Sequence, residues 1–229
     1  MKRETTNKIR FIIEDIFPPV LRDSIFFKWI AQAAWGPHIS ALSEFRKNAP
    51  FLSEEEYESL YRDHPRVHDM TDNSEACIQR IAEEVVGNSL LDVGCGTGFL
   101  LKRVVALAGN RFERVTGTDL IAPEEDVDNI EIVTAKIESL PFTDNEFDTV
   151  ICTHVIEHIL DYRQAIAELR RVCARKLIIV VPREREYRYT FNPHFNFFPY
   201  PESFLRAMQP VPADWVCIDI GRDIFYCES

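Results

Sequence analysis

The 229-residue sequence lacks several patterns that mark specialised classes of protein. Its six cysteines include no C-x-x-C pair, so neither a thiolate zinc site nor a disulfide framework is expected. No uncharged run has the length of a signal core or a membrane-spanning helix. These absences predict a reduced, cytoplasmic protein without stable membrane insertion.

Positive charge is also scarce. The densest basic stretch, residues 183–188, alternates arginine with glutamate, and the net charge is −11. A field of that sign repels polyphosphate, so no nucleic acid partner is expected. The 46% hydrophobic content is enough for a folded core.

The first 72 residues differ in character from the rest. Helices are expected over 6–16, 21–35 and 53–64, with Pro18-Pro19 and Gly36-Pro37 as breaks and a capping box of Ser53 and Glu56. Packing of 25–35 on the domain or on a second subunit is favoured over a membrane interface, and a homodimer is left open. We therefore expect an N-terminal helical extension or cap over 1–72 and a second domain over 73–229.

From residue 73 onward, predicted strands and helices alternate, which is typical of an α/β fold with a mostly parallel sheet and helices on both faces. The short Gly221-Arg222 connection predicts a final antiparallel hairpin. Strands are expected at 89–93, 114–118, 130–134, 147–152, 176–181, 214–220 and 223–228. Helices are expected at 74–86, 99–108, 162–173 and 201–208.

The segment LLDVGCGTGFL at 90–100 is the most informative part of the chain. Its apolar run passes an acid into three alternating glycines, which predicts a strand, a tight turn and a helix start where a ligand can lie against the main chain. The dinucleotide fingerprint would need its third glycine at Phe99, so a pyrophosphate cofactor is disfavoured. Asp119 ends the next strand 21 residues after Gly98, close to the usual offset of a ribose-binding carboxylate.

Four segments in this order resemble the class I S-adenosylmethionine (SAM) dependent methyltransferases: residues 90–98, 115–120, 135–142 and 147–159. The resemblance implies a Rossmann-like sheet of seven strands with an antiparallel last strand, and SAM as the cofactor. It also implies that Asp92 orients the glycine loop and the methionine end of SAM, and that Asp119 binds the ribose. The cofactor-binding residues expected in this way are Asp92, Gly94, Cys95, Gly96, Gly98, Asp119, Leu120, Lys136, Ile137, Thr153 and His154.

The third segment departs from the family pattern, which places an acid near Lys136 to meet the adenine amino group. Lysine cannot accept that hydrogen bond. The adenine would instead be read by the backbone around Lys136 and Ile137, with Leu120 and Ile137 packing on the ring, or by Glu138. Lys136 as a plain solvated residue is an equal alternative.

Residues 154–158 read H-x-x-E-H, a zinc-peptidase pattern. That interpretation needs a long helix and a third ligand on another helix, whereas here a strand runs directly into the motif and Asp161 starts the next helix. We therefore expect no metal. The family resemblance instead implies that Thr153 and His154 approach SAM, and that His158 faces the acceptor or braces the loop.

The aromatic stretch 192–200 resembles an acceptor-side loop of small-molecule methyltransferases, and its His194 is a candidate general base. Core packing of these aromatics with a bystander His194 is an equal alternative. No D/N-P-P-Y/F motif follows the fourth strand, which argues against adenine or glutamine amino groups as acceptors. The candidate catalytic residues are His158 and His194.

Taken together, these features predict transfer of a methyl group from SAM to a small-molecule, sugar or lipid-linked acceptor. A SAM-binding module without catalysis is the main alternative, because it would keep the segment from Gly94 to Asp119 and lose only the acceptor site. A nicotinamide-dependent oxidoreductase is the less favoured one.

Overall fold

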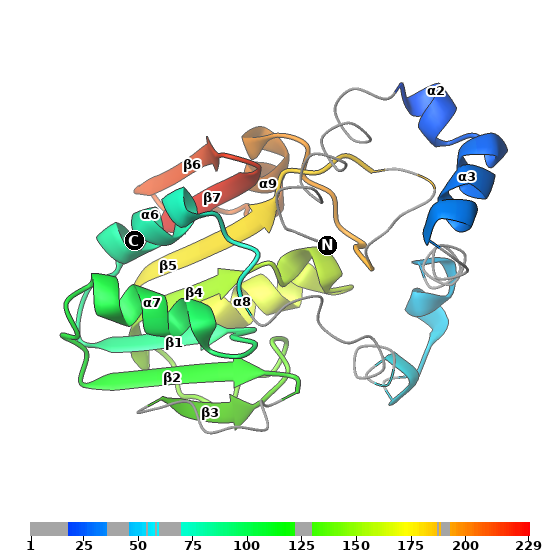
Figure 1. Cartoon of the computed structure of the whole chain (residues 1–229). Helices are drawn as coiled ribbons and strands as arrows, with labels where there is room; N and C mark the ends of the chain where they lie inside the picture. The colour runs from blue at the N-terminus through cyan, green and yellow to red at the C-terminus, as the bar shows by residue number, and fades with distance from the viewer. Residues whose placement is uncertain are drawn as a thin grey trace.

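The computed structural model describes residues 18–35, 46–53, 55–57, 59, 70–121, 130–186, 188 and 193–229. At its centre is a seven-stranded sheet in the order β3-β2-β1-β4-β5-β7-β6 (Figure 1). The strands are β1 (Ser89–Val93), β2 (Arg114–Asp119), β3 (Glu131–Thr134), β4 (Phe147–Thr153), β5 (Cys173–Pro182), β6 (Trp215–Ile220) and β7 (Asp223–Glu228). The described helices are α2 (Pro19–Arg22), α3 (Ile25–Trp35), η2 (Ala49–Phe51), α6 (Glu75–Glu84), α7 (Phe99–Leu107), η3 (Ile156–His158), α8 (Tyr162–Val172) and α9 (Pro201–Ala207).

The expected fold class is confirmed. Strands β1 to β5 pair in parallel, and β7 runs antiparallel to both β5 and β6. Gly221 has a φ of 67° in the tight β6–β7 turn, a conformation that glycine adopts without strain. Both hairpin strands therefore lie where the sequence placed them.

Most element boundaries differ from the expectation by one or two residues, and two differences are larger. The helix expected over 21–35 is split into α2 and α3, because the Ser24 hydroxyl accepts a hydrogen bond from Phe27 N at 3.1 Å and begins a new helix. Cys173, expected to end a helix, begins β5 instead, with extended backbone angles of −91° and 122°. The helix expected over 6–16 lies outside the described residues.

Helices cover both faces of the sheet. The pair α6 and α7 packs on one face, with Leu90 and Ile151 pointing toward it, while Leu91 and Cys152 point to the opposite face with α8 and α9. The central strands β1, β4 and β5 read as nearly continuous apolar runs because both of their faces are buried. This arrangement leaves the carboxyl ends of the parallel strands as the place for a ligand.

The N-terminal extension contacts the loop that follows β5. Arg22 donates to the Glu186 carbonyl at 3.3 Å, and Arg188 N donates to the Asp23 carboxylate at 2.8 Å. Figure 1 shows β1 and β2 running toward the side of the molecule where α2 and α3 lie. None of the described helices combines the length and the apolar character that a membrane span requires.

Candidate active site

The glycine loop connects β1 to α7. Gly94, Gly96 and Gly98 have φ angles of 79°, 61° and 74°, so all three lie in the left-handed region that glycine tolerates. The backbone N–H groups of Gly94 and Cys95 both donate to the Thr118 carbonyl, at 2.7 and 2.9 Å. The loop is therefore tied to β2, and the predicted strand, turn and helix start are confirmed.

Two close approaches explain why glycine is needed in this loop and in the strand beside it. A Cβ on Gly94 would lie 2.2 Å from Val155 Cγ2, and a Cβ on Gly117 would lie 2.7 Å from Cys95 Sγ. The Cys95 side chain thus packs over β2, and it is buried. The part of Cys95 that shapes the loop is its backbone.

Asp92 is a buried carboxyl at the end of β1. Its side chain is 1% exposed, and neither of its oxygens has a hydrogen-bond partner among the described residues. Burial, together with the charge of Asp119, raises the pKa of Asp92 to about 7. A buried polar group without a partner is costly, so this carboxyl is a candidate to accept a hydrogen bond from a ligand.

Asp119 ends β2, and its carboxylate binds the backbone of the glycine loop and of the segment that follows β2. Oδ2 accepts from Gly96 N at 2.8 Å, and Oδ1 accepts from Ile121 N at 3.1 Å. Its backbone carbonyl accepts from Ala135 N at 3.0 Å. The following Leu120 is half-buried.

The third segment forms a turn after β3. Ser139 N donates to the Lys136 carbonyl at 3.1 Å, and Lys136 is half-buried. Ile137 is 5% exposed and belongs to the same core cluster as Leu140. Ile137 therefore has a packing role that does not depend on a ligand.

The chain leaves β4 through Thr153 and His154. Thr153 Oγ1 accepts from Asn73 Nδ2 at 3.0 Å, and His154 has a φ of 55°, which is strained for a non-glycine residue. Burial alone would lower the pKa of His154, but its contacts with Glu157 and Asp223, at 3.6 and 3.7 Å, raise it. The exit from β4 is thus charged and buried.

A cluster of acids and imidazoles lies beyond this exit. His194 Nδ1 is 2.5 Å from Glu184 Oε2, His158 Nδ1 is 3.2 Å from the Pro193 carbonyl, and the two rings stack edge to face with centroids 4.7 Å apart. Burial and the neighbouring His194 lower the pKa of His158 to about 4. Burial would raise the pKa of Glu157, but the adjacent histidines hold it well below its usual range.

The described aromatic residues of the stretch 192–200 differ in their surroundings. Phe198 is buried and packs edge to face on Phe204, whereas Phe195 lies with its ring 6.3 Å from that of Tyr57. Tyr57 Oη also donates to the His158 carbonyl at 2.6 Å. Phe198 thus packs in the core, as one of the two interpretations of this stretch expects, and Phe191 lies outside the described residues.

The sequence did not single out Glu184 or Asn73. Glu184 follows β5 by two residues, and its carboxylate lies 2.5 Å from His194 Nδ1 although ten residues separate the two along the chain. Asn73 directly precedes the cap of α6, which gave no signal of a contact with Thr153. A carboxylate shortly before a candidate histidine was the only available clue.

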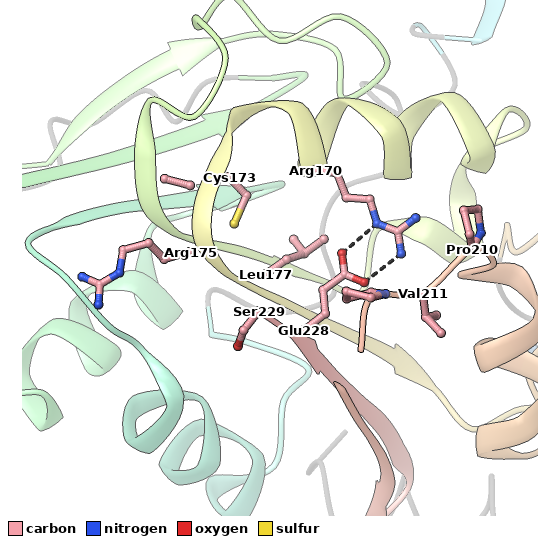
Figure 2. Close-up of a pocket in the computed structure, with 10 residues that line it drawn as sticks. Arg170, Cys173, Arg175, Leu177, Pro210, Val211, Glu228 and Ser229 are labelled. Atoms are coloured by element: carbon pink, nitrogen blue, oxygen red, sulfur yellow. Dashed lines mark hydrogen bonds and ion pairs between the residues drawn. The ribbon is translucent and has the colours of Figure 1, made fainter. Parts of the chain in front are cut away.

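A separate cavity lies away from these residues. It has a volume of about 400 Å³ and lies at the amino end of β5. Figure 2 shows Arg170 and Glu228 on its wall. These two side chains form a bidentate ion pair at 2.7 Å for both contacts, so their charges satisfy each other. The cavity is at the edge of the sheet opposite to the glycine loop.

Comparison with known proteins agrees with this geometry. Residues 91–181 match the model of a family described as "Methyltransferase domain". The ubiquinone/menaquinone biosynthesis C-methyltransferase UbiE of Hahella chejuensis is 35% identical over 96 residues, which cover 38% of this chain and 39% of that protein. A probable S-adenosylmethionine-dependent methyltransferase of Mycolicibacterium smegmatis is 29% identical over 154 residues, covering 64% of this chain and 52% of that protein.

A solved structure shares the fold. The crystal structure of a SAM-dependent methyltransferase from Aquifex aeolicus superposes with a TM-score of 0.52 at 17% identity, covering 78% of this chain and all of that chain. The curated relatives are matched over a smaller share of their length, 39% for the protein from Hahella.

Proposed function

We propose that this chain is a class I SAM-dependent methyltransferase that binds SAM and transfers the methyl group to a small-molecule acceptor. The observation that carries the proposal is the buried Asp92 carboxyl, whose oxygens have no hydrogen-bond partner among the described residues. It lies at the carboxyl end of β1, directly before the glycine loop. Asp119 occupies the corresponding place on the neighbouring strand.

The described residues fit the cofactor in three ways. Gly94, Gly96 and Gly98 have no side chain, so they tolerate the positive φ angles of the loop and let a ligand approach its backbone. Asp119 uses one lone pair on each oxygen for Gly96 N and Ile121 N, and a carboxylate keeps further acceptor sites for ribose hydroxyls. Asp92 would accept a hydrogen bond from the polar end of the ligand and so gain the partner that it lacks among the described residues.

The rate of methyl transfer depends mainly on the alignment of the methyl donor with the acceptor. SAM supplies an electrophilic methyl group, and the protein contributes by holding the acceptor in line and excluding water. We propose that His158 and His194 line the acceptor side, and that residues 1–72 cover it through Tyr57, which contacts Phe195. With a pKa of about 4, His158 is neutral at pH 7 and a weak base, which favours a positioning role over proton abstraction.

A small organic acceptor is favoured by two observations. The matched relative from Hahella is named as a C-methyltransferase of ubiquinone/menaquinone biosynthesis, and the net charge of −11 disfavours nucleic acid. The roles assigned here to Lys136, Ile137, Leu120, Thr153 and His154 in cofactor binding are part of the same proposal.

The test is an acceptor screen with methyl-labelled SAM and fractionated small molecules of a cell extract. Label should enter an extractable small molecule, and Asp119→Ala should reduce this incorporation at a SAM concentration that just saturates the wild-type protein. Label found only in macromolecules would contradict the acceptor class. Tight SAM binding without transfer to any fraction would indicate a binding module without catalysis.

A further inference from the structure

The cluster beyond β4 brings together three metal-binding side chains from separate segments. One ligand atom each of Glu157, His158 and His194 lies within 4.8 Å of the other two. Glu157 and His158 belong to η3 after β4, whereas His194 belongs to the loop after β5. The sequence motif H-x-x-E-H supplied only two of these groups, and its first histidine is not among them.

In both histidine rings Nδ1 has a hydrogen-bond acceptor, which leaves Nε2 available for another contact. The Pro193 carbonyl can only accept, so His158 Nδ1 donates to it, at 3.2 Å. The Glu184 carboxylate likewise accepts from His194 Nδ1, at 2.5 Å. In a neutral imidazole this assigns the lone pair to Nε2 in each ring. A carboxylate or carbonyl on the second nitrogen is the usual support of a metal-bound histidine.

Glu157 completes the donor set with a buried oxygen that lacks a partner. The residue is 1% exposed, and its Oε2 has no hydrogen-bond partner within the described ranges. Its Oε1 lies 4.0 Å from His158 Nε2, too far for a hydrogen bond but close enough to share an ion. A cation between these atoms would add to His154, which lies 3.6 Å from Oε1, in compensating the charge of this buried carboxylate.

The two ligand-bearing segments are fixed to each other by backbone contacts. Phe195 N donates to the Glu157 carbonyl at 2.7 Å. The Asn196 side chain donates to the carbonyls of Ile156 and Ile159, at 2.8 and 2.7 Å. The geometry of the donor set is therefore determined by the fold, as a metal site requires.

We propose that Glu157, His158 and His194 form a binding site for a divalent transition-metal ion, with Zn²⁺ as the best match. Two imidazole nitrogens and one carboxylate oxygen suit zinc, whereas magnesium and calcium prefer all-oxygen sites. Tetrahedral bonds of about 2.1 Å place ligand atoms about 3.4 Å apart, so the side chains close by about 1 Å on binding. Three protein ligands leave a fourth position for water or a ligand oxygen.

The proposed site does not include the glycine loop, Asp92 or Asp119, and it differs from the metal-free expectation from the sequence. The zinc interpretation was set aside there because no long helix and no helical third ligand were in view. The third group instead comes from a loop 36 residues after His158, and its partner Glu184 lies at the end of β5.

The test measures metal binding to the full chain after chelator treatment and dialysis. Calorimetry with Zn²⁺ should show one saturable site, and Co²⁺ should give the visible absorption of a tetrahedral complex. Glu157→Gln and His194→Ala should each weaken affinity at least 100-fold. Glu184→Gln, which removes only the support of the His194 ring, should weaken it about 10- to 100-fold.

The matched control is Glu202→Gln, which changes an exposed carboxylate on α9 and should leave affinity unchanged. Circular dichroism without metal establishes that each variant folds, and Glu157→Gln preserves shape if His194→Ala does not. No saturable site in the wild-type protein, or a site that both ligand variants retain, would overturn the proposal. Binding of S-adenosylhomocysteine to the same samples reports on the proposed function separately.

Discussion

Asp92 and Asp119 lie at the carboxyl ends of the paired strands β1 and β2, and the charge of Asp119 adds to burial in raising the pKa of Asp92. The two carboxyls are not equivalent. Asp119 is stabilised by two backbone N–H groups, whereas Asp92 has no hydrogen-bond partner among the described residues. We therefore expect the Asp92 carboxylate to destabilise the ligand-free protein and the Asp119 carboxylate to strengthen ligand binding.

Asp92 should make the ligand-free protein less stable as the pH rises. Its pKa rises from an ordinary 3.8 to about 7 on folding, so the folded state holds the proton more tightly. The stabilisation is complete below pH 4 and is lost as the pH approaches 7, about 4 kcal/mol in total. Denaturant unfolding from pH 5 to 8 should show this slope in the wild-type protein, and Asp92→Asn should flatten it. An unchanged slope in the variant would exclude Asp92 as its source.

S-adenosylhomocysteine should raise the melting temperature. A ligand that binds only the folded state stabilises it by about 2.7 kcal/mol at a concentration 100 times its dissociation constant. NAD at the same concentration is the control and should have no effect, because Phe99 stands where the dinucleotide fingerprint has its third glycine. A shift with NAD alone would reverse the assignment of the cofactor.

Asp119→Ala should weaken S-adenosylhomocysteine binding by roughly 1.5 to 3 kcal/mol, the value of charge-assisted hydrogen bonds to the ribose. Calorimetry measures the effect, with Asp214→Ala as the control because Asp214 is exposed at the opposite edge of the sheet. Asp119→Asn keeps an oxygen that can accept from Gly96 N. This variant therefore separates the effect of loop order on affinity from the effect of the carboxylate charge. Full affinity in a folded Asp119→Ala protein would remove this residue from the site.

Gly94→Ala should be far more damaging than Gly109→Ala, although both glycines have φ near 80°. The shared left-handed backbone costs an alanine about 1 kcal/mol. Gly109 has nothing within 4 Å of an added Cβ, whereas at Gly94 the Cβ would lie 2.2 Å from Val155 Cγ2. Melting temperatures and S-adenosylhomocysteine affinity of the two variants test this, and equal effects would mean that the close contact with Val155 is relieved at no cost.

Much of the fold was predictable because its signals are local. Alternation of apolar runs with helical patterns, the three glycines after β1 and the Gly221-Arg222 turn each depend on residues next to one another in the chain. The errors occurred at element ends. Ser24 starts a new helix by a single hydroxyl contact, and Cys173 extends a strand because β5 pairs with β4 from its first residue.

The sequence by itself determined the sheet, the glycine loop and the acids that follow β1 and β2, since parallel strands bring their carboxyl ends to one edge. Only the tertiary structure decided how Glu157, His158 and His194 meet. Their proximity depends on how the loop after β5 folds back over η3, where Glu184 and the Pro193 carbonyl orient the rings. Contacts between such distant segments arise from packing, so no spacing in the chain could reveal them.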